Sequence, residues 1–161
     1  MKPRQIKIIF ARKKRGISKY IQSKTWSRWS HVAIIDGDSV IQSIGIPPLK
    51  LFLVLFGIIP NSVSLGGVVR TPLNDFLETY KDTRIAYIDG NINIARAMIN
   101  VVMYDAWGVV GLRLGKRIDC TDKMSCAKLV WVCHAHCRNS FANRATPQRI
   151  LEMSYDTEQN V

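Results

Sequence analysis

The chain has 161 residues, of which 47% are hydrophobic and 22% are charged. It is therefore long enough for one ordinary domain with a real core, and too apolar to be disordered overall. No apolar run is long enough to span a bilayer, because the nearest candidate, residues 49–59, is interrupted by Lys50.

The charge of the chain is strongly positive and unevenly placed. Lys and Arg number 23 against 12 Asp and Glu, a net charge of +11, and the first acidic residue is Asp36. The basic segment 1–28 suits an anionic partner such as an anionic polymer or a membrane surface, although a solvated basic face explains it equally well. It carries no nucleic-acid-binding motif, so we expect no specific nucleic acid partner.

The N-terminus lacks the apolar core and small-residue cleavage site of a secretory signal. We therefore expect cytoplasmic synthesis and reduced thiols, with action at the cell envelope as an open alternative. We also expect residues 1–161 to form a single domain.

Short strands and separate helices alternate along the chain, which indicates the α+β class. In the first half of the chain, we predict a strand at residues 6–10, a short helix at 17–24, and a hairpin of residues 31–35 and 39–44 around an Asp36-Gly37-Asp38 turn. A strand at 68–70 follows, then a helix opened by Thr71-Pro72, a strand at 84–88, a turn at 89–91 and a helix from 94 to about 104. The last predicted elements are a glycine-punctuated loop at 106–116, a helix near Cys126 and a helix opened by Thr146-Pro147.

The helix near Cys126 is the first candidate for chemistry. Cys126, Leu129, Val130, Cys133 and Cys137 recur at the spacing of one helical face. Either Asp122 or Ser125 can cap its start. A cysteine in the first turn of a helix is favoured as the thiolate, which is the nucleophilic form. The alternative is a small core residue on a buried helix.

A thiolate nucleophile needs a base within hydrogen-bond reach and a polar group that orients that base. Of only three histidines in the chain, His31 opens a predicted strand directly after a polar-aromatic loop. If the hairpin is regular, Gln42 on the returning strand lies near the same end. Its amide oxygen can accept the imidazole N–H while remaining neutral.

Several short motifs together resemble a known family. They are Ser30-His31-Val32-Ala33-Ile34-Ile35, Val40-Ile41-Gln42-Ser43, Gly67-Val68-Val69-Arg70-Thr71-Pro72-Leu73, Tyr104-Asp105-Ala106-Trp107-Gly108, Ser125-Cys126-Ala127-Lys128-Leu129-Val130 and Thr146-Pro147. In this order and spacing the chain resembles the circularly permuted branch of the NlpC-like papain-fold superfamily. That branch includes bacterial and phage cell-wall cysteine peptidases and, more distantly, the lecithin–retinol acyltransferase group.

The resemblance implies a papain-like fold with a small antiparallel sheet packed against helices. It implies Cys126 as nucleophile, His31 as general base and Gln42 as the orienting residue, with no cofactor. The implied reaction is hydrolysis of an amide bond, with cell-wall peptide as the leading substrate. Members of the branch often have an acidic residue where this chain has Gln42, and Ser-Glu where it has Ala127-Lys128.

Other residues offer competing sites. The stretch Cys133-His134-Ala135-His136-Cys137 looks like a metal cluster. On a helix, residues 133 and 137 share a face, whereas residues 134 and 136 point in nearly opposite directions, so one zinc ion could hardly use all four and no metal is expected. Asp119-Cys120 is a rival nucleophile stretch. Trp26 and Trp29 are either loop anchors or a substrate rim. Tyr104 either packs at a helix end or supplies a hydroxyl near the oxyanion.

Two other functions remain open at this point. One is acyl hydrolysis or acyl transfer on a lipid, and the other is a non-catalytic basic module that binds nucleic acid or an envelope polymer. Residues 49–59 are predicted either to cover a substrate groove or dock on lipid or a second subunit, or to be buried in the core.

Overall fold

A computed structural model describes residues 4–13, 18, 22–23, 26–45, 66–104, 124–134 and 145–156. Within them, five strands form one antiparallel sheet in the order β4-β3-β2-β1-β5. The strands are β1 (Arg4–Arg12), β2 (His31–Asp36), β3 (Ser39–Gly45), β4 (Gly66–Pro72) and β5 (Asp82–Gly90). The helices are α3 (Leu73–Thr79), α4 (Ile92–Met98), α6 (Cys126–Cys133) and α7 (Pro147–Met153). The predicted α+β class is therefore confirmed.

The β2–β3 hairpin follows directly from its turn residues. Asp36 pairs with Ser39, which leaves a two-residue turn. Gly37 opens that turn with φ of 61°, a backbone conformation that glycine adopts without a steric penalty. The predicted hairpin is confirmed, and its register places Ile34 opposite Ile41.

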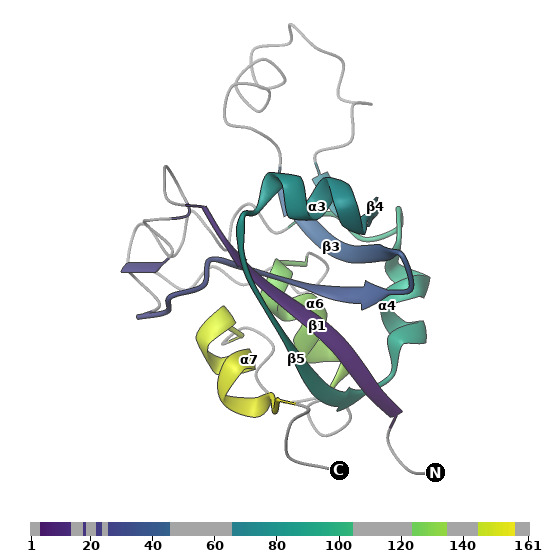
Figure 1. The fold of residues 1–161 in the computed structure, drawn as a ribbon. Helices are drawn as coiled ribbons and strands as arrows, with labels where there is room; N and C mark the ends of the chain where they lie inside the picture. The colour runs from purple at the N-terminus through teal and green to yellow at the C-terminus, as the bar shows by residue number, and fades with distance from the viewer. Residues whose placement is uncertain are drawn as a thin grey trace, which may run out of the picture.

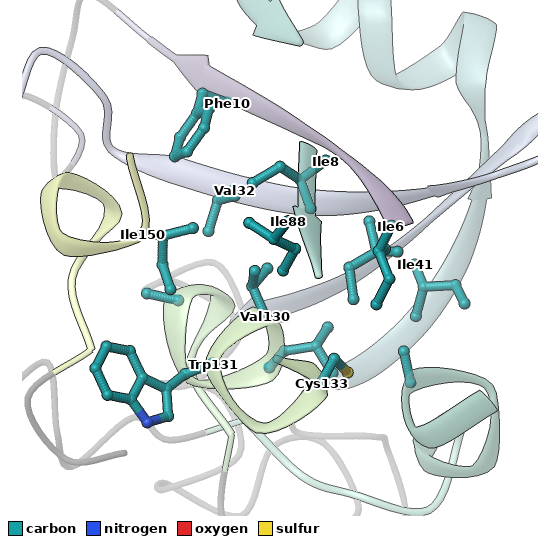
Figure 2. Packing of buried hydrophobic residues seen from close by; sticks show 14 of the residues in the cluster. Ile6, Ile8, Phe10, Val32, Ile41, Ile88, Val130, Trp131, Cys133 and Ile150 are labelled. Carbon is teal, nitrogen blue, oxygen red and sulfur yellow. The ribbon is translucent and has the colours of Figure 1, made fainter. Parts of the chain in front are cut away.

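The larger core lies between one face of the sheet and three helices. Alternate residues of β1 (Ile6, Ile8 and Phe10) point toward Val130 of α6, as Figure 2 shows. Helix α6 contacts both α4 and α7, which lie on either side of it in Figure 1. Because successive side chains of a strand point to opposite faces, the intervening residues Ile9 and Ala11 form a second, smaller cluster with Phe76 of α3.

Three predicted boundaries of helices and turns are wrong, and the first two lie at the ends of β4 and β5. Thr71 does not cap a helix: it belongs to β4, and α3 begins after Pro72 without a side-chain cap. The predicted turn at residues 89–91 is instead the end of β5, followed by Asn91, whose side chain caps α4.

Helix α4 also ends at Met98, well before Tyr104. The chain after it runs along β4, where Asn100 N–H donates to Val68 O at 2.9 Å and Val68 N–H donates to Val102 O at 3.0 Å. Asn100 makes the change of direction with φ of 60°, a conformation that asparagine tolerates better than most residues. Pairing with a strand therefore overrides the helical spacing of the apolar residues here.

Helix α6 begins and is capped as one of the two predicted alternatives requires. Ser125 is its N-cap, and the hydroxyl oxygen accepts from Lys128 N–H at 3.3 Å. Thr146 and Pro147 likewise open α7 as predicted. Residues 49–59, residues 106–116 and most of the helix predicted at residues 17–24 lie outside the described residues. Within the described part of the chain, no helix is long and apolar enough to cross a membrane.

One buried carboxylate ties the hairpin turn to two other elements. The side chain of Asp36, 8% exposed, accepts from Arg70 of β4 and from Arg96 of α4, the latter at 2.6 and 3.1 Å. The hydrogen bond from Arg96 is the main cause that lowers the pKa of Asp36, and burial opposes it only in part. The charged form of Asp36 therefore contributes to folding stability.

We predict that Asp36→Asn lowers the free energy of unfolding by about 1 kcal/mol at neutral pH, because it keeps the shape and removes the charge. The lowered pKa means that this contribution is present above roughly pH 4, the ordinary carboxyl value, and is lost as pH falls through the folded-state pKa. Denaturant unfolding of both proteins over a pH series measures the difference. A gap that stays constant into strong acid contradicts the prediction.

Candidate active site

Cys126 is the first residue of α6 and is partly buried. Its backbone N–H is one of those that a helix leaves without an intrahelical partner. The start of α6 is held in place by the residue before its cap. Ser43 Oγ of β3 donates to Met124 O at 2.6 Å, and Met124 N–H donates to Met103 O at 2.9 Å. The sulfur is therefore positioned from β3 as well as by the helix.

His31 is the first residue of β2, paired with Ala11 of β1, and its side chain is buried. Its ring atom Nε2 lies 2.9 Å from Oε1 of Gln42. Since an amide oxygen only accepts, His31 Nε2 is the donor in this contact. The other ring nitrogen, Nδ1, then remains available for a contact on the opposite side of the imidazole.

Gln42 is itself held by the neighbouring strand. Its Nε2 donates to Oγ1 of Thr71 at 2.9 Å. The order His31, Gln42, Thr71 thus runs across three adjacent strands, β2, β3 and β4. A threonine hydroxyl both donates and accepts, so Thr71 fixes the amide group while leaving its oxygen for His31.

An aromatic ring covers the imidazole. Tyr80, at the end of α3, stacks on His31 with ring centroids 5.3 Å apart and an interplanar angle of 9°. Phe76 lies 6.1 Å from His31 and 4.7 Å from Tyr80 between ring centroids. These contacts restrict rotation of the imidazole and shield it from water.

The sulfur of Cys126 and the ring of His31 interact directly. Burial alone would raise the pKa of the thiol, but the charge of His31, a side-chain hydrogen bond from His31 and backbone N–H groups of Val32 and Ala127 together lower the pKa of Cys126. Burial alone would lower the pKa of His31. The Cys126 charge, its hydrogen bond with Cys126 and the hydrogen bond with Gln42 raise that pKa, against the charge of Lys13. Opposite shifts of this kind favour a thiolate–imidazolium pair.

The structure thus brings together all three predicted site residues, Cys126, His31 and Gln42. Cys133, one turn or more into α6, lies in the core instead, and burial raises its pKa to about 12. Cys120 and Cys137 lie outside the described residues.

The structure also shows where the described residues of the competing sites lie. Trp29 is a buried loop anchor that packs on Phe10 with ring centroids 6.1 Å apart, whereas Trp26 is 92% exposed. The Tyr104 ring packs so closely over Gly45 that a Cβ there would lie 2.7 Å from it. Only the first two residues of the stretch 133–137 are described. The described residues contain no group of three side chains able to hold a metal ion.

Four residues around the site escape sequence reasoning: Lys13, Ser43, Thr71 and Tyr80. Thr71-Pro72 looks like a helix start, and Tyr80 follows the apolar spacing of α3, so each has a convincing local interpretation. Their contacts with His31, Gln42 and Met124 join distant parts of the chain. The pairing register of β3 and β4 would have identified Thr71. Val40 pairs with Thr71 and Gln42 with Val69, so Thr71 lies diagonally across from Gln42 on the same face of the sheet.

Comparison with known protein families matches residues 5–160 to the permuted papain-like amidase enzymes of the YaeF/YiiX, C92 family. The chain belongs to this family. As a permuted papain-like amidase it is a hydrolase of the cysteine amidase type, which agrees with the resemblance of its ordered motifs. No curated protein and no solved structure gives a match.

We predict that a limiting amount of iodoacetamide labels Cys126 before Cys133 near neutral pH, because the pKa of Cys126 is lowered and that of Cys133, the other described cysteine, is raised. The labelling rate should rise with pH through a midpoint below about 8.5, the ordinary thiol value. His31→Ala should slow labelling at neutral pH and move the midpoint upward, since burial remains and the cation is gone. Peptide mapping by mass spectrometry gives the rate at each cysteine, and first labelling of Cys133 or Cys120 overturns the assignment.

We predict that Gln42→Ala reduces kcat by about 10-fold, less than His31→Ala, because the role expected for Gln42 is to orient His31 and not to transfer the proton itself. Gln42→Glu should preserve or raise kcat/KM and extend its alkaline limb to higher pH. The carboxylate stabilises the imidazolium, so the pKa of His31 rises further and the charged pair survives to higher pH. The pH profile of kcat/KM measures both effects.

Substitutions of Thr71 provide a second test of the same orienting role. Thr71→Val keeps the side-chain shape and removes the hydroxyl that holds Gln42, so kcat should fall by several fold, whereas Thr71→Ser should restore it. Unchanged kcat in both Gln42→Ala and Thr71→Val would mean that another residue orients His31.

Proposed function

We propose that this amidase hydrolyses amide bonds in peptides through Cys126 as nucleophile, His31 as general base and acid, and Gln42 as the orienting residue, with cell-wall peptide as the leading substrate. The observation that carries the proposal is the hydrogen-bonded interaction of Cys126 with His31, whose ring is held on its other side by Gln42 at 2.9 Å. Nucleophile, base and orienting group in this order are what cysteine-dependent acyl chemistry requires.

The first half of the reaction forms a thioester. The Cys126 thiolate attacks the carbonyl carbon of the amide, and the π electrons move to oxygen to give a tetrahedral oxyanion. The backbone N–H of Cys126, at the start of α6, is one donor to this oxygen. As the carbon–nitrogen bond breaks, His31 gives its proton to the leaving nitrogen, and a neutral amine departs.

The second half releases the acid. Neutral His31 removes a proton from water, and the resulting hydroxide attacks the thioester carbonyl. Collapse of the second oxyanion breaks the carbon–sulfur bond and yields the carboxylic acid product. The thiolate and the imidazolium are restored, so no other co-reactant is needed.

We predict that the purified protein cleaves amide bonds in peptides derived from peptidoglycan, and that Cys126→Ala reduces the rate by at least about 10³-fold without altering the fold. Cys133→Ala is the matched control, because it removes a thiol from the same helix and should leave the activity near wild type. Product analysis by mass spectrometry identifies the bond that is broken.

The same assay separates the alternatives. Cleavage of lipid acyl esters but not of peptide amides would move the substrate to lipid. Undiminished amide cleavage by Cys126→Ala would remove this residue from the mechanism.

A further inference from the structure

Lys13 is held beside the proposed catalytic pair by its backbone. It directly follows β1, and its N–H donates to Ser18 Oγ at 3.0 Å. Ser18 Oγ in turn contacts the hydroxyl of Ser30, the residue before His31, and Ser30 N–H donates to Ala11 O at 3.2 Å. The backbone of Lys13 and the start of β2 are therefore fixed relative to each other.

The side chain of Lys13 extends from this anchor over the aromatic cover of the base. Its ammonium lies 4.9 Å from the centroid of the Tyr80 ring, and that ring stacks on His31. The charge of Lys13 is close enough to lower the pKa of His31. The ammonium and the imidazole thus share one local environment.

Two other described cations near Lys13 are already paired with a carboxylate. Arg12 contacts Asp82, and Arg28 lies 3.6 Å from the same carboxylate. Within the described residues, no ion pair involves Lys13, which is exposed. The proposed thiolate–imidazolium pair is neutral as a whole and Gln42 is uncharged, so Lys13 gives this side of the site a net positive charge.

The chemistry of His31 determines which part of a substrate meets that charge. In the proposed reaction, the imidazolium gives its proton to the leaving nitrogen, so the leaving group must lie beside His31. We infer that Lys13 binds a carboxylate carried by the amine leaving group, which makes the preferred substrates amides of amino acids or peptides with a free carboxylate next to the scissile bond. This inference rests on the proposed function and specifies its substrate class.

A physical consequence separates this role from a purely structural one. An ammonium next to the imidazole disfavours the imidazolium, because like charges repel. A bound carboxylate would cancel that repulsion at the moment when the imidazolium must be present to act as an acid. An anionic leaving group would therefore gain both in binding and in proton transfer, and a neutral one would gain in neither.

The test compares two peptides that share the same acyl part, with the leaving amino acid as the free carboxylate in one and as the carboxamide in the other. The measured quantity is the ratio of kcat/KM for the carboxylate to kcat/KM for the carboxamide. Any effect of a substitution on His31 that both substrates share cancels in this ratio. We expect a ratio of roughly 10 in the wild type, the usual size of one charge-assisted hydrogen bond, and a smaller ratio at high ionic strength.

The substitutions change only the charge at position 13. Lys13→Gln should bring the ratio close to one, Lys13→Glu should bring it below one, and Lys13→Arg should retain the preference. Lys7→Gln is the matched control, because Lys7 is an exposed lysine on β1, the strand that precedes Lys13, and it should leave the ratio unchanged.

The possible failures are distinguishable. A wild-type ratio near one, or a ratio that Lys13→Glu does not alter, overturns the inference and leaves the proposed function standing. A preference that appears only when the carboxylate is moved to the acyl part also overturns it, because the leaving group would then not be the anionic part. Cleavage of neither peptide, nor of any other amide, removes the proposed function and this inference together.

Discussion

The interaction between the Cys126 sulfur and the His31 ring sets the demands that the rest of the site must meet. Two charges shielded from water are costly unless each has further hydrogen-bond partners. The sulfur receives backbone N–H groups from Val32 and Ala127, and the imidazole has the Gln42 oxygen at 2.9 Å. Because each charge lowers the cost of the other, the two groups titrate as a coupled pair. Loss of either one should therefore change the reactivity of its partner as well as its own.

Strand β3 connects the two halves of this pair. Gln42 and Ser43 are consecutive, so their side chains point to opposite faces of the sheet. Gln42 holds the base, while Ser43 binds Met124 O, two residues before Cys126. The relative position of Cys126 and His31, the proposed nucleophile and base, is thus fixed by the geometry of one inner strand of the sheet. Such an arrangement is more rigid than a site assembled on loops.

The parts of this site that depend on local sequence pattern could be predicted from the sequence. The apolar spacing and Ser125 locate Cys126 at a helix start, and the Asp36-Gly37-Asp38 turn brings His31 and Gln42 to the same end of a hairpin. What local pattern misses is pairing between distant segments. Thr71 satisfies the rule for a helix cap and yet lies in β4, because the ladder with β3 continues to Pro72. Helix α4 likewise stops at Met98, because the residues that follow pair with β4.

The neutral side chain of Gln42 and the positive charge of Lys13 together determine the net charge of the site. A carboxylate at this position, which is common in the permuted branch that the chain resembles, would stabilise the imidazolium more strongly and would offset the charge of Lys13. With Gln42 the thiolate–imidazolium pair is neutral, and the ammonium of Lys13 near His31 makes the surroundings positive. A site of this charge would favour an anionic substrate more than a site in which a carboxylate at position 42 offset the charge of Lys13. The weaker support of the imidazolium before substrate binds and the preference proposed for anionic leaving groups are therefore two effects of the same charge distribution.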